Sequence, residues 1–410
     1  MKCLVATRQC FLGLLAGVFS MTAISGAAAD HGTAFDKAID SAKVIADARM
    51  RYEGVDQNDL AENADALTLR LRAGFVTGEV SGTSLGVDFE WVESLVGDYN
   101  STTNGKTRFP VVADPEEVEL NQLYLQNTAL PETTLTVGRQ RLMLDDSRFV
   151  GNVGWRQNEQ TFDALRLTNG SIEGVRFDVA YIRQVNRVFG AGSMASPWHG
   201  DSFLANVSYD LGVGKLTGFA YLIEVEEVPV NSSQTYGLRF AGRKKIDAVT
   251  VNYALSYATQ RDNRQNPVDY SADYYLIDVG VDYAGAVLGG AYEVLDGDGV
   301  KGFATPLATL HGFQGWTDKF LMTPANGVAD LSFKAGYGWR DVGPFSAVDA
   351  LAVYHDFKAE RGSASYGSEI GFMLKAVWKN TGFTVKYAEY DARTFAVDTR
   401  KFWFEAAYGF

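Results

Sequence analysis

The last ten residues, KFWFEAAYGF at positions 401–410, alternate between two kinds of side chain. Successive side chains in an extended strand point to opposite faces, so one face of such a strand is entirely apolar. That face carries Phe402, Phe404, Ala406, Tyr408 and Phe410. The last residues of a soluble domain usually fray. A terminus built in this way is therefore expected to be held inside a sheet.

The same period of two recurs along most of the chain. In ADALTLRLRAGF, residues 64–75, Leu67, Leu69 and Leu71 face one way while Arg70 and Arg72 face the other. The period of 3.6 residues that marks a helix is hard to find beyond residues 34–46. The pattern predicts an all-β protein of about eighteen antiparallel strands.

The connections between these strands alternate between short and long. Short ones are expected near 77–83, 129–132, 169–173, 210–214, 242–246, 341–345 and 379–382, and long ones near 54–65, 95–117, 141–160, 185–200, 260–272 and 295–327. This rhythm is typical of a transmembrane up-and-down barrel with short periplasmic turns and long extracellular loops. A large secreted β-sandwich is the competing interpretation, in which the apolar stripes would form the interior. The rhythm and strand lengths near ten residues favour a barrel over residues 43–410.

The first thirty residues have the features of a secretion signal. Lys2 and Arg8 precede an apolar run, and Ala27 and Ala29 form the A-x-A pattern of a cleavage site. We predict a signal peptide at 1–29, a short periplasmic segment at 30–42, and location in the outer membrane of a Gram-negative bacterium. Both cysteines lie within this leader, so the mature chain cannot form a disulfide scaffold or a thiolate metal site. A net charge of −13 argues against nucleic acid as a partner.

Two stretches resemble segments of alginate-export-type outer-membrane porins. They are VGRQRLMLDDSRFVGNVGWRQNEQTFDALRL at 137–167 and GFATPLATLHGFQGWTDKFL at 302–321. The resemblance implies a monomeric barrel of about eighteen strands. The terminal alternation also resembles the signal that the barrel assembly machinery reads in outer-membrane proteins. The residues that would carry this signal are Phe402, Phe404, Tyr408 and Phe410.

The same two stretches are candidate constriction loops. They carry charged and aromatic residues at Arg141, Asp145, Asp146, Arg148, Trp155, Arg156, His311 and Trp316. One hypothesis is that the first loop folds into the lumen and its paired charges line a narrow passage. The other is an ordered outer loop held by surface ion pairs. The second stretch is apolar enough that we expect it to pack on or inside the barrel mouth.

Charged residues opposite the apolar stripes are predicted to line a wet lumen, because Lys or Arg on the lipid face at midplane costs about 2–4 kcal/mol. The basic candidates are Arg49, Arg51, Arg70, Arg72, Arg176, Arg239, Lys334 and Lys375. The acidic candidates are Asp47, Asp88, Glu90, Asp178 and Glu369. Arg49, Arg51, Arg70 and Arg72 should form a basic patch on one wall, unless the two signs pair with one another and only stiffen it.

These features predict a porin for passive diffusion of hydrophilic, anionic or sugar-like solutes, with outer-membrane lipid around it. Export of an acidic polysaccharide is the alternative. Two further interpretations are a closed structural or adhesive barrel and an outer-membrane enzyme. The four histidines form no metal-type pair, so the sequence predicts no catalytic residues, metal or cofactor.

Overall fold

The computed structural model describes residues 34–410. The predicted signal peptide at 1–29 lies outside the described residues, as does the start of the predicted 30–42 segment. The rest of that segment forms the short helix α2 (Ala34–Asp40). Its Ala38 carbonyl accepts a hydrogen bond of 2.8 Å from the Gly78 amide, in the first short turn of the sheet. No helix in residues 34–410 has the length and apolar character needed to cross a membrane.

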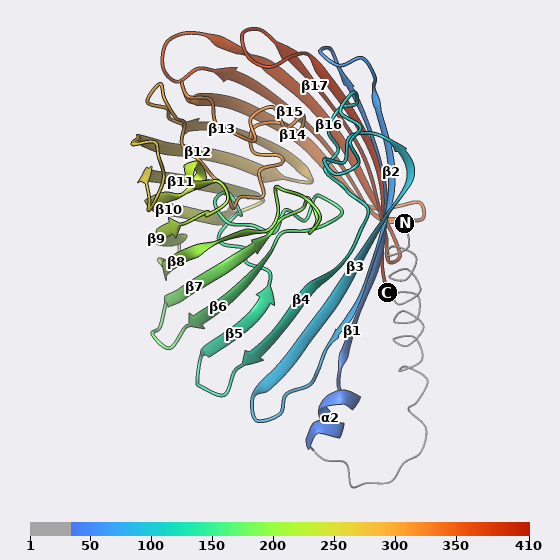
Figure 1. Cartoon of the computed structure of the whole chain (residues 1–410), viewed down its shortest axis with the longest axis vertical. Coiled ribbons are helices and arrows are strands. Elements are labelled where there is room, and N and C mark those ends of the chain that lie inside the picture. Colours follow the sequence, from blue (N-terminus) through green and yellow to red (C-terminus); the bar gives the residue numbers. More distant parts are fainter. Residues whose placement is uncertain (1–33) are drawn as a thin grey trace.

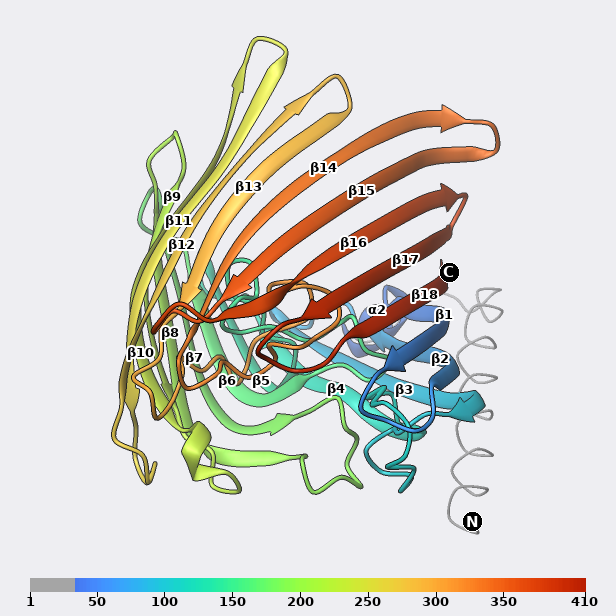
Figure 2. The same ribbon diagram turned by 90° about the horizontal axis from the view of Figure 1, so that it is seen from above.

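The remaining chain forms eighteen antiparallel strands in one sheet (Figures 1 and 2). They are β1 (Lys43–Gln57), β2 (Ala64–Val76), β3 (Thr83–Asp98), β4 (Glu117–Asn127), β5 (Thr133–Gln140), β6 (Thr161–Asn169), β7 (Val175–Asn186), β8 (Trp198–Asp210), β9 (Lys215–Ile223), β10 (Ser233–Ile246), β11 (Val249–Asp262), β12 (Ser271–Tyr283), β13 (Ala286–Leu295), β14 (Val328–Val342), β15 (Phe345–Lys358), β16 (Ser365–Trp378), β17 (Thr381–Ala392) and β18 (Thr399–Gly409). A single 3-10 turn, η1 (Pro229–Asn231), interrupts the β9–β10 connection.

The sheet closes because its last strand pairs with its first. β1 pairs with both β2 and β18, and Gly409 lies opposite Asp47 in the β1–β18 register. The Phe410 amide donates a hydrogen bond of 3.2 Å to the Ala46 carbonyl. The C-terminus is thus pinned into the seam that removes the open edges of the sheet. The predicted eighteen-stranded up-and-down barrel is confirmed.

The short and long connections gather at opposite ends of the barrel, called here the short-turn end and the long-loop end. The long loops that matter below are 99–116, 141–160, 187–197 and 296–327. The turn expected at 242–246 is wrong, because β10 continues to Ile246. The chain reverses instead at 247–248, where Asp247 has a positive φ of 54°. A second tight turn at 284–285 and the outer loops 224–232, 359–364 and 393–398 were not predicted.

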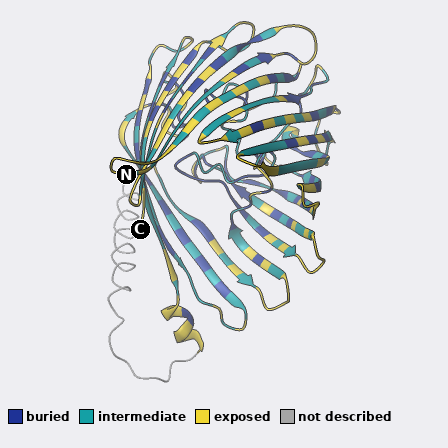
Figure 3. Cartoon of the chain, turned by 180° about the vertical axis from the view of Figure 1, so that it is seen from behind, coloured by how far each residue is buried: buried dark blue, intermediate teal, exposed yellow. Residues whose placement is uncertain are grey.

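The two faces of the sheet differ as the alternation predicts (Figure 3). Large apolar side chains such as Leu255, Ile277 and Phe333 are exposed on the outer face. Charged side chains such as Arg51 and Glu53 are buried on the inner face. The apolar stripes do not pack against one another, so the sandwich interpretation is wrong. The outer face has the apolar surface that lipid requires.

A charge on the outer face should therefore destabilise the barrel. Leu255 lies near the middle of β11 and is 48% exposed on the outer face. We expect Leu255→Lys to lower the free energy of unfolding by about 2–4 kcal/mol, the cost of a cation near the bilayer midplane. Equilibrium unfolding of protein inserted in lipid bilayers measures this change.

The matched control is Asn252→Lys on the same strand. Asn252 faces inward and donates a hydrogen bond of 2.9 Å to Asp282, so a lysine there can pair with that carboxylate. Equal losses of stability in the two variants would contradict the assignment of the faces.

Candidate functional site: the lumen and its inward loops

Loop 141–160 crosses the lumen. Near its start, Asp145 accepts a hydrogen bond of 2.8 Å from Asn206 on β8, and Asp146 pairs with Arg239 on β10 at 2.8 Å. Near its end, Gln157 Oε1 accepts a hydrogen bond of 2.9 Å from Arg49 on β1. In the closed strand order, β10 lies half-way round the barrel from β1. The structure therefore places this loop inside the barrel rather than on its outer surface (Figure 1).

Loop 296–327 packs against loop 141–160 to form a single body. The Gly151 amide donates a hydrogen bond of 2.9 Å to the Leu307 carbonyl, and Val150 and Leu307 form a bridge. Arg148 joins both loops to the wall: its guanidinium donates to Glu293 on β13 at 2.6 Å and to Gln314 at 3.0 Å. Apolar side chains from both loops belong to one buried cluster with wall residues of β6–β17. The second stretch therefore packs inside the barrel, one of the two expected positions.

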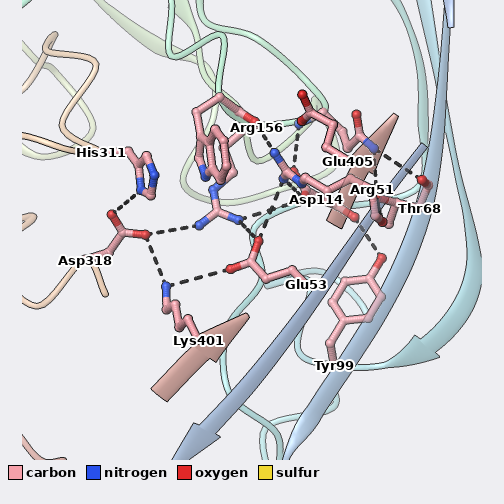
Figure 4. A network of polar contacts seen from close by, with 12 residues as sticks. Arg51, Glu53, Thr68, Tyr99, Asp114, Arg156, His311, Asp318, Lys401 and Glu405 are labelled. Atoms are coloured by element: carbon pink, nitrogen blue, oxygen red, sulfur yellow. Dashed lines mark hydrogen bonds and ion pairs between the residues drawn. The ribbon is translucent and has the colours of Figure 1, made fainter. Parts of the chain in front are cut away.

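Buried ion pairs anchor these loops to the β1–β18 wall (Figure 4). Arg156 pairs with Glu53 at 3.0 Å and with Asp318 at 3.4 Å, and Lys401 pairs with Asp318 at 3.1 Å. Arg51 pairs with Asp114, which comes from loop 99–116. Burial alone would raise the pKa of the Asp114 carboxyl, but Arg51 and Arg156 hold it below its usual value. Asp114 therefore stays ionised and keeps loops 99–116 and 141–160 joined to β1.

The predicted basic patch exists as a ladder, but its charges are neutralised. Arg49 lies opposite Arg70 on the paired strands β1 and β2, and Arg72 lies opposite Asp47. Arg70 pairs with Asp47, and Arg72 pairs with Glu90 and, at 2.9 Å, with Glu159 of loop 141–160.

The same loop carboxylate serves a second arginine. Glu159 also accepts a hydrogen bond of 2.6 Å from the Nε of Arg141. Burial would raise the pKa of Glu159, yet Arg141 and Arg72 lower it to about 2. The alternative in which basic and acidic residues pair with one another thus describes this wall better than an open basic surface does.

An aromatic clamp closes around Lys386 of β17. Trp155 and His311, one from each inward loop, stack with ring centroids 4.4 Å apart. The Lys386 ammonium lies 4.0 Å from the Trp316 ring centre and 2.8 Å from His311 Nε2. An ammonium group can only donate, so Nε2 accepts and Nδ1–H donates to Asp318 at 2.8 Å. Burial lowers the pKa of His311 to about 4, which keeps the ring neutral in this position.

The other predicted lumen residues occupy the remaining walls. Asp88 accepts hydrogen bonds from Asn121 and Gln122, and Glu369 accepts from the Thr317 amide at 3.1 Å. Two further acid–base contacts are Asp178 with Arg166 at 2.6 Å and Lys334 with Asp278 at 3.6 Å. Arg176 and Lys375 are exposed on the inner face. Phe402, Phe404, Tyr408 and Phe410 are exposed on the outer face of the last strand and terminus.

Several residues of the site were missed by sequence reasoning. They are Asp114, Gln157, Glu159, Asp318 and Lys401. The run Trp155–Gln160 holds polar or charged residues at five successive positions, which is unusual beside a strand and was the available signal for two of them. Asp114 and Asp318 lie in ordinary-looking loop sequence, and only the folded loops bring them to arginines.

Removing the tie at Arg148 should loosen the inward loops. In Arg148→Met the Glu293 carboxylate stays buried without its cation, and breaking a buried pair from one side costs about 3–5 kcal/mol. We expect larger and noisier single-channel conductance in planar bilayers, because both loops lose their joint anchor on β13. Arg166→Met is the control, since Arg166 pairs with Asp178 on the wall and touches neither loop. Indistinguishable current traces from the two variants would rule out this anchoring role.

Comparison with known proteins agrees with this geometry. Residues 41–190 match the family model for alginate export. The match contains the whole 137–167 stretch, while the 302–321 stretch lies beyond it. No curated protein sequence matches the chain.

Solved structures match over nearly the whole barrel. OccAB4 of Acinetobacter baumannii superimposes with a TM-score of 0.71 at 13% identity, covering 90% of this chain and 98% of that one. OccK9 (OpdG) of Pseudomonas aeruginosa gives 0.71 at 14% identity, covering 91% and 100%. The outer membrane protein OpdK of Pseudomonas aeruginosa gives 0.69 at 13% identity, covering 90% and 99%. The predicted resemblance is confirmed: the chain is an eighteen-stranded barrel of the outer-membrane porin fold, and its residues 41–190 match the alginate-export family model.

Proposed function

We propose that this protein is a monomeric outer-membrane channel through which small hydrophilic solutes diffuse down their gradients. The observation that carries the proposal is the pair of charged loops tied across the inside of a barrel whose outer face is apolar. An apolar outer face and a polar, loop-narrowed interior are what a porin needs. One of the solved structures with this fold, OpdK, is an outer membrane protein, which fits the same interpretation.

The short-turn half of the lumen supports a preference for anions. Arg176 on β7 and Lys375 on β16 face inward, and neither forms an ion pair with another residue of 34–410. The arginines of the β1–β2 wall, in contrast, have their charges balanced by carboxylates. Unbalanced cations along a water-filled passage raise the local concentration of anions and slow cations.

Export of an acidic polysaccharide is the second candidate, favoured by the alginate-export match at residues 41–190. A polymer needs a continuous passage, whereas loop 141–160 is tied to opposite walls of this barrel and loop 296–327 is joined to it and to β18. Export would therefore require both loops to move together. Diffusion of small solutes requires only a narrow gap beside them, which makes it the better-supported function.

The proposal places further partners around the barrel. Outer-membrane lipid covers the apolar belt, and the barrel assembly machinery reads the strand that ends in Phe410. The short turns then face the periplasm and the long loops face the outside, with both ends of the processed chain in the periplasm.

Planar bilayer recording tests the channel and its selectivity together. We expect discrete conductance steps and a reversal potential in a KCl gradient that shows chloride preference. The double variant Arg176→Gln with Lys375→Gln should shift the chloride-to-potassium permeability ratio towards cations, because it removes two cations without freeing a carboxylate.

Arg340→Gln with Lys358→Gln is the matched control. Both residues are paired, with Asp349 and Asp356, and both are largely exposed at the ends of their strands. Absence of conductance steps would refute the channel and favour a closed barrel. Polysaccharide export would be favoured by a current that an oligomeric uronate blocks completely, in a channel that excludes neutral solutes of disaccharide size.

A further inference from the structure

A cavity of about 280 Å³ opens at the long-loop end, and Arg156, Asp318 and Lys401 of the ion-pair network form part of its lining. Its lining comes from the end of β1 and from loops 99–116, 141–160, 187–197 and 296–327, with Lys401 of β18 at its base. A solute entering from the long-loop side meets this cavity beside His311, which lines it and belongs to the aromatic clamp. Small-molecule sites are concave, mostly apolar, and carry a few polar groups.

Most of the cavity wall is apolar. Apolar side chains come from five separate segments, and they include Val55, Leu60, Val111, Phe189 and Leu310. Removing apolar surface from water here stabilises a bound molecule by roughly 25 cal/mol for each Å² buried. The wall therefore favours a solute with a compact apolar body over one covered in hydroxyl groups.

The charged groups of the cavity do not balance. Arg156 and Lys401 are shared between Asp318 and Glu53, so two cations meet two carboxylates. Lys319 and Arg187 also line the cavity. Neither lies within ion-pair distance of a carboxylate in the described chain, so the residues that line the cavity carry an excess of positive charge.

The surroundings of Lys319 show why this excess would attract an anion. Its ammonium donates a hydrogen bond of 2.9 Å to Gln57 Oε1, which is a neutral acceptor. Burial, and then repulsion from Lys401, lower the pKa of Lys319 to about 8. A bound anion would offset both effects, because an opposite charge nearby favours the ionised form of a buried group.

Arg187 is held in place with part of its guanidinium free. The group lies 3.7 Å from the Trp198 ring centre and 4.7 Å from that of Phe189. Its Nη1 donates a hydrogen bond of 2.8 Å to the Ala195 carbonyl. The rings fix the plane of the guanidinium and leave its other N–H groups able to donate to a ligand.

We propose that this cavity is a binding site for a small organic monoanion with an apolar body, whose acidic group is bound by Lys319 and Arg187. The site rests on the proposed channel function and specifies which solutes gather at the channel mouth. A polyuronate is also an anion, but its sugar rings carry hydroxyl groups. These groups would lie against Val111 and Leu310 without hydrogen-bond partners. The site therefore favours a monomeric amphipathic acid over an acidic polymer.

Three ring compounds separate the contribution of the ligand's negative charge from that of its apolar ring. Cyclohexanecarboxylate carries both features, cyclohexanecarboxamide removes the charge, and glucuronate keeps the carboxylate on a hydroxylated ring. We expect isothermal titration of the detergent-solubilised barrel at pH 7 to show cyclohexanecarboxylate binding at least tenfold more tightly than either comparator. Equal affinity for the carboxamide would refute the role of the cations, and equal affinity for glucuronate would refute the role of the apolar wall.

Two variants locate the site. Lys319→Gln should lower the affinity for cyclohexanecarboxylate about tenfold or more, in line with a lost charge-assisted hydrogen bond. Lys106→Gln is the matched control, because Lys106 is an exposed long-loop lysine that pairs with Asp98 at 3.6 Å. Unchanged affinity in Lys319→Gln, or an equal loss in Lys106→Gln, would overturn the proposal.

The titration also distinguishes this proposal from the channel itself. A protein that binds the carboxylate selectively but shows no conductance steps would refute the channel and leave the site standing. A conducting barrel that binds all three compounds equally would refute the site and leave the channel standing.

Discussion

Closure of the β1–β18 seam is the constraint on which the rest of the structure depends. A sheet in lipid cannot leave backbone groups unpaired, because no water is available to satisfy them. The seam must therefore extend to the end of the chain, and the Phe410 amide completes it on Ala46. Once the barrel is closed, side-chain alternation leaves only two environments. One face meets lipid, and every charged residue of the other face must find water or a partner inside.

That inner environment explains why the loops fold inward. Arg51 and Glu53 sit on the wall with almost no exposure, and the side chain of Arg72 is 13% exposed. Carboxylates of the β1–β2 wall alone do not balance these arginines. Asp114, Arg156 and Glu159 arrive from loops and complete the pairs. Leaving a buried charge unpaired costs several kcal/mol, so the wall and the loops require one another. The inward loops are thus a consequence of wall charge as well as a means of narrowing the passage.

The fold was predictable from the sequence to a greater extent than the site. Alternation places Arg49, Arg70 and Glu90 on the inner face without any knowledge of register, because the period of two is intrinsic to a strand. Strand ends were less predictable: the charged run at 242–246 looks like a turn, yet Arg243 and Lys245 simply continue the inner face of β10. Contacts such as Arg156 with Asp318 join residues 162 positions apart. No local pattern encodes them, since they depend on how two loops meet inside the closed barrel.

The distribution of balanced and unbalanced charge decides where selection of solutes can occur. At the level of Arg51, Arg72 and Lys401, cations and carboxylates lie within ion-pair distance, so their fields largely cancel a short way into the passage. Cations without carboxylate partners in the described chain remain at Lys319 beside the mouth and at Lys375 in the short-turn half. In the proposed channel, a solute would therefore be sorted by charge at both ends of the lumen and by size at its centre. Ion pairs suit selection by size at the centre, because they hold the width of the passage constant. An unpaired cation, in contrast, remains available to bind a passing anion.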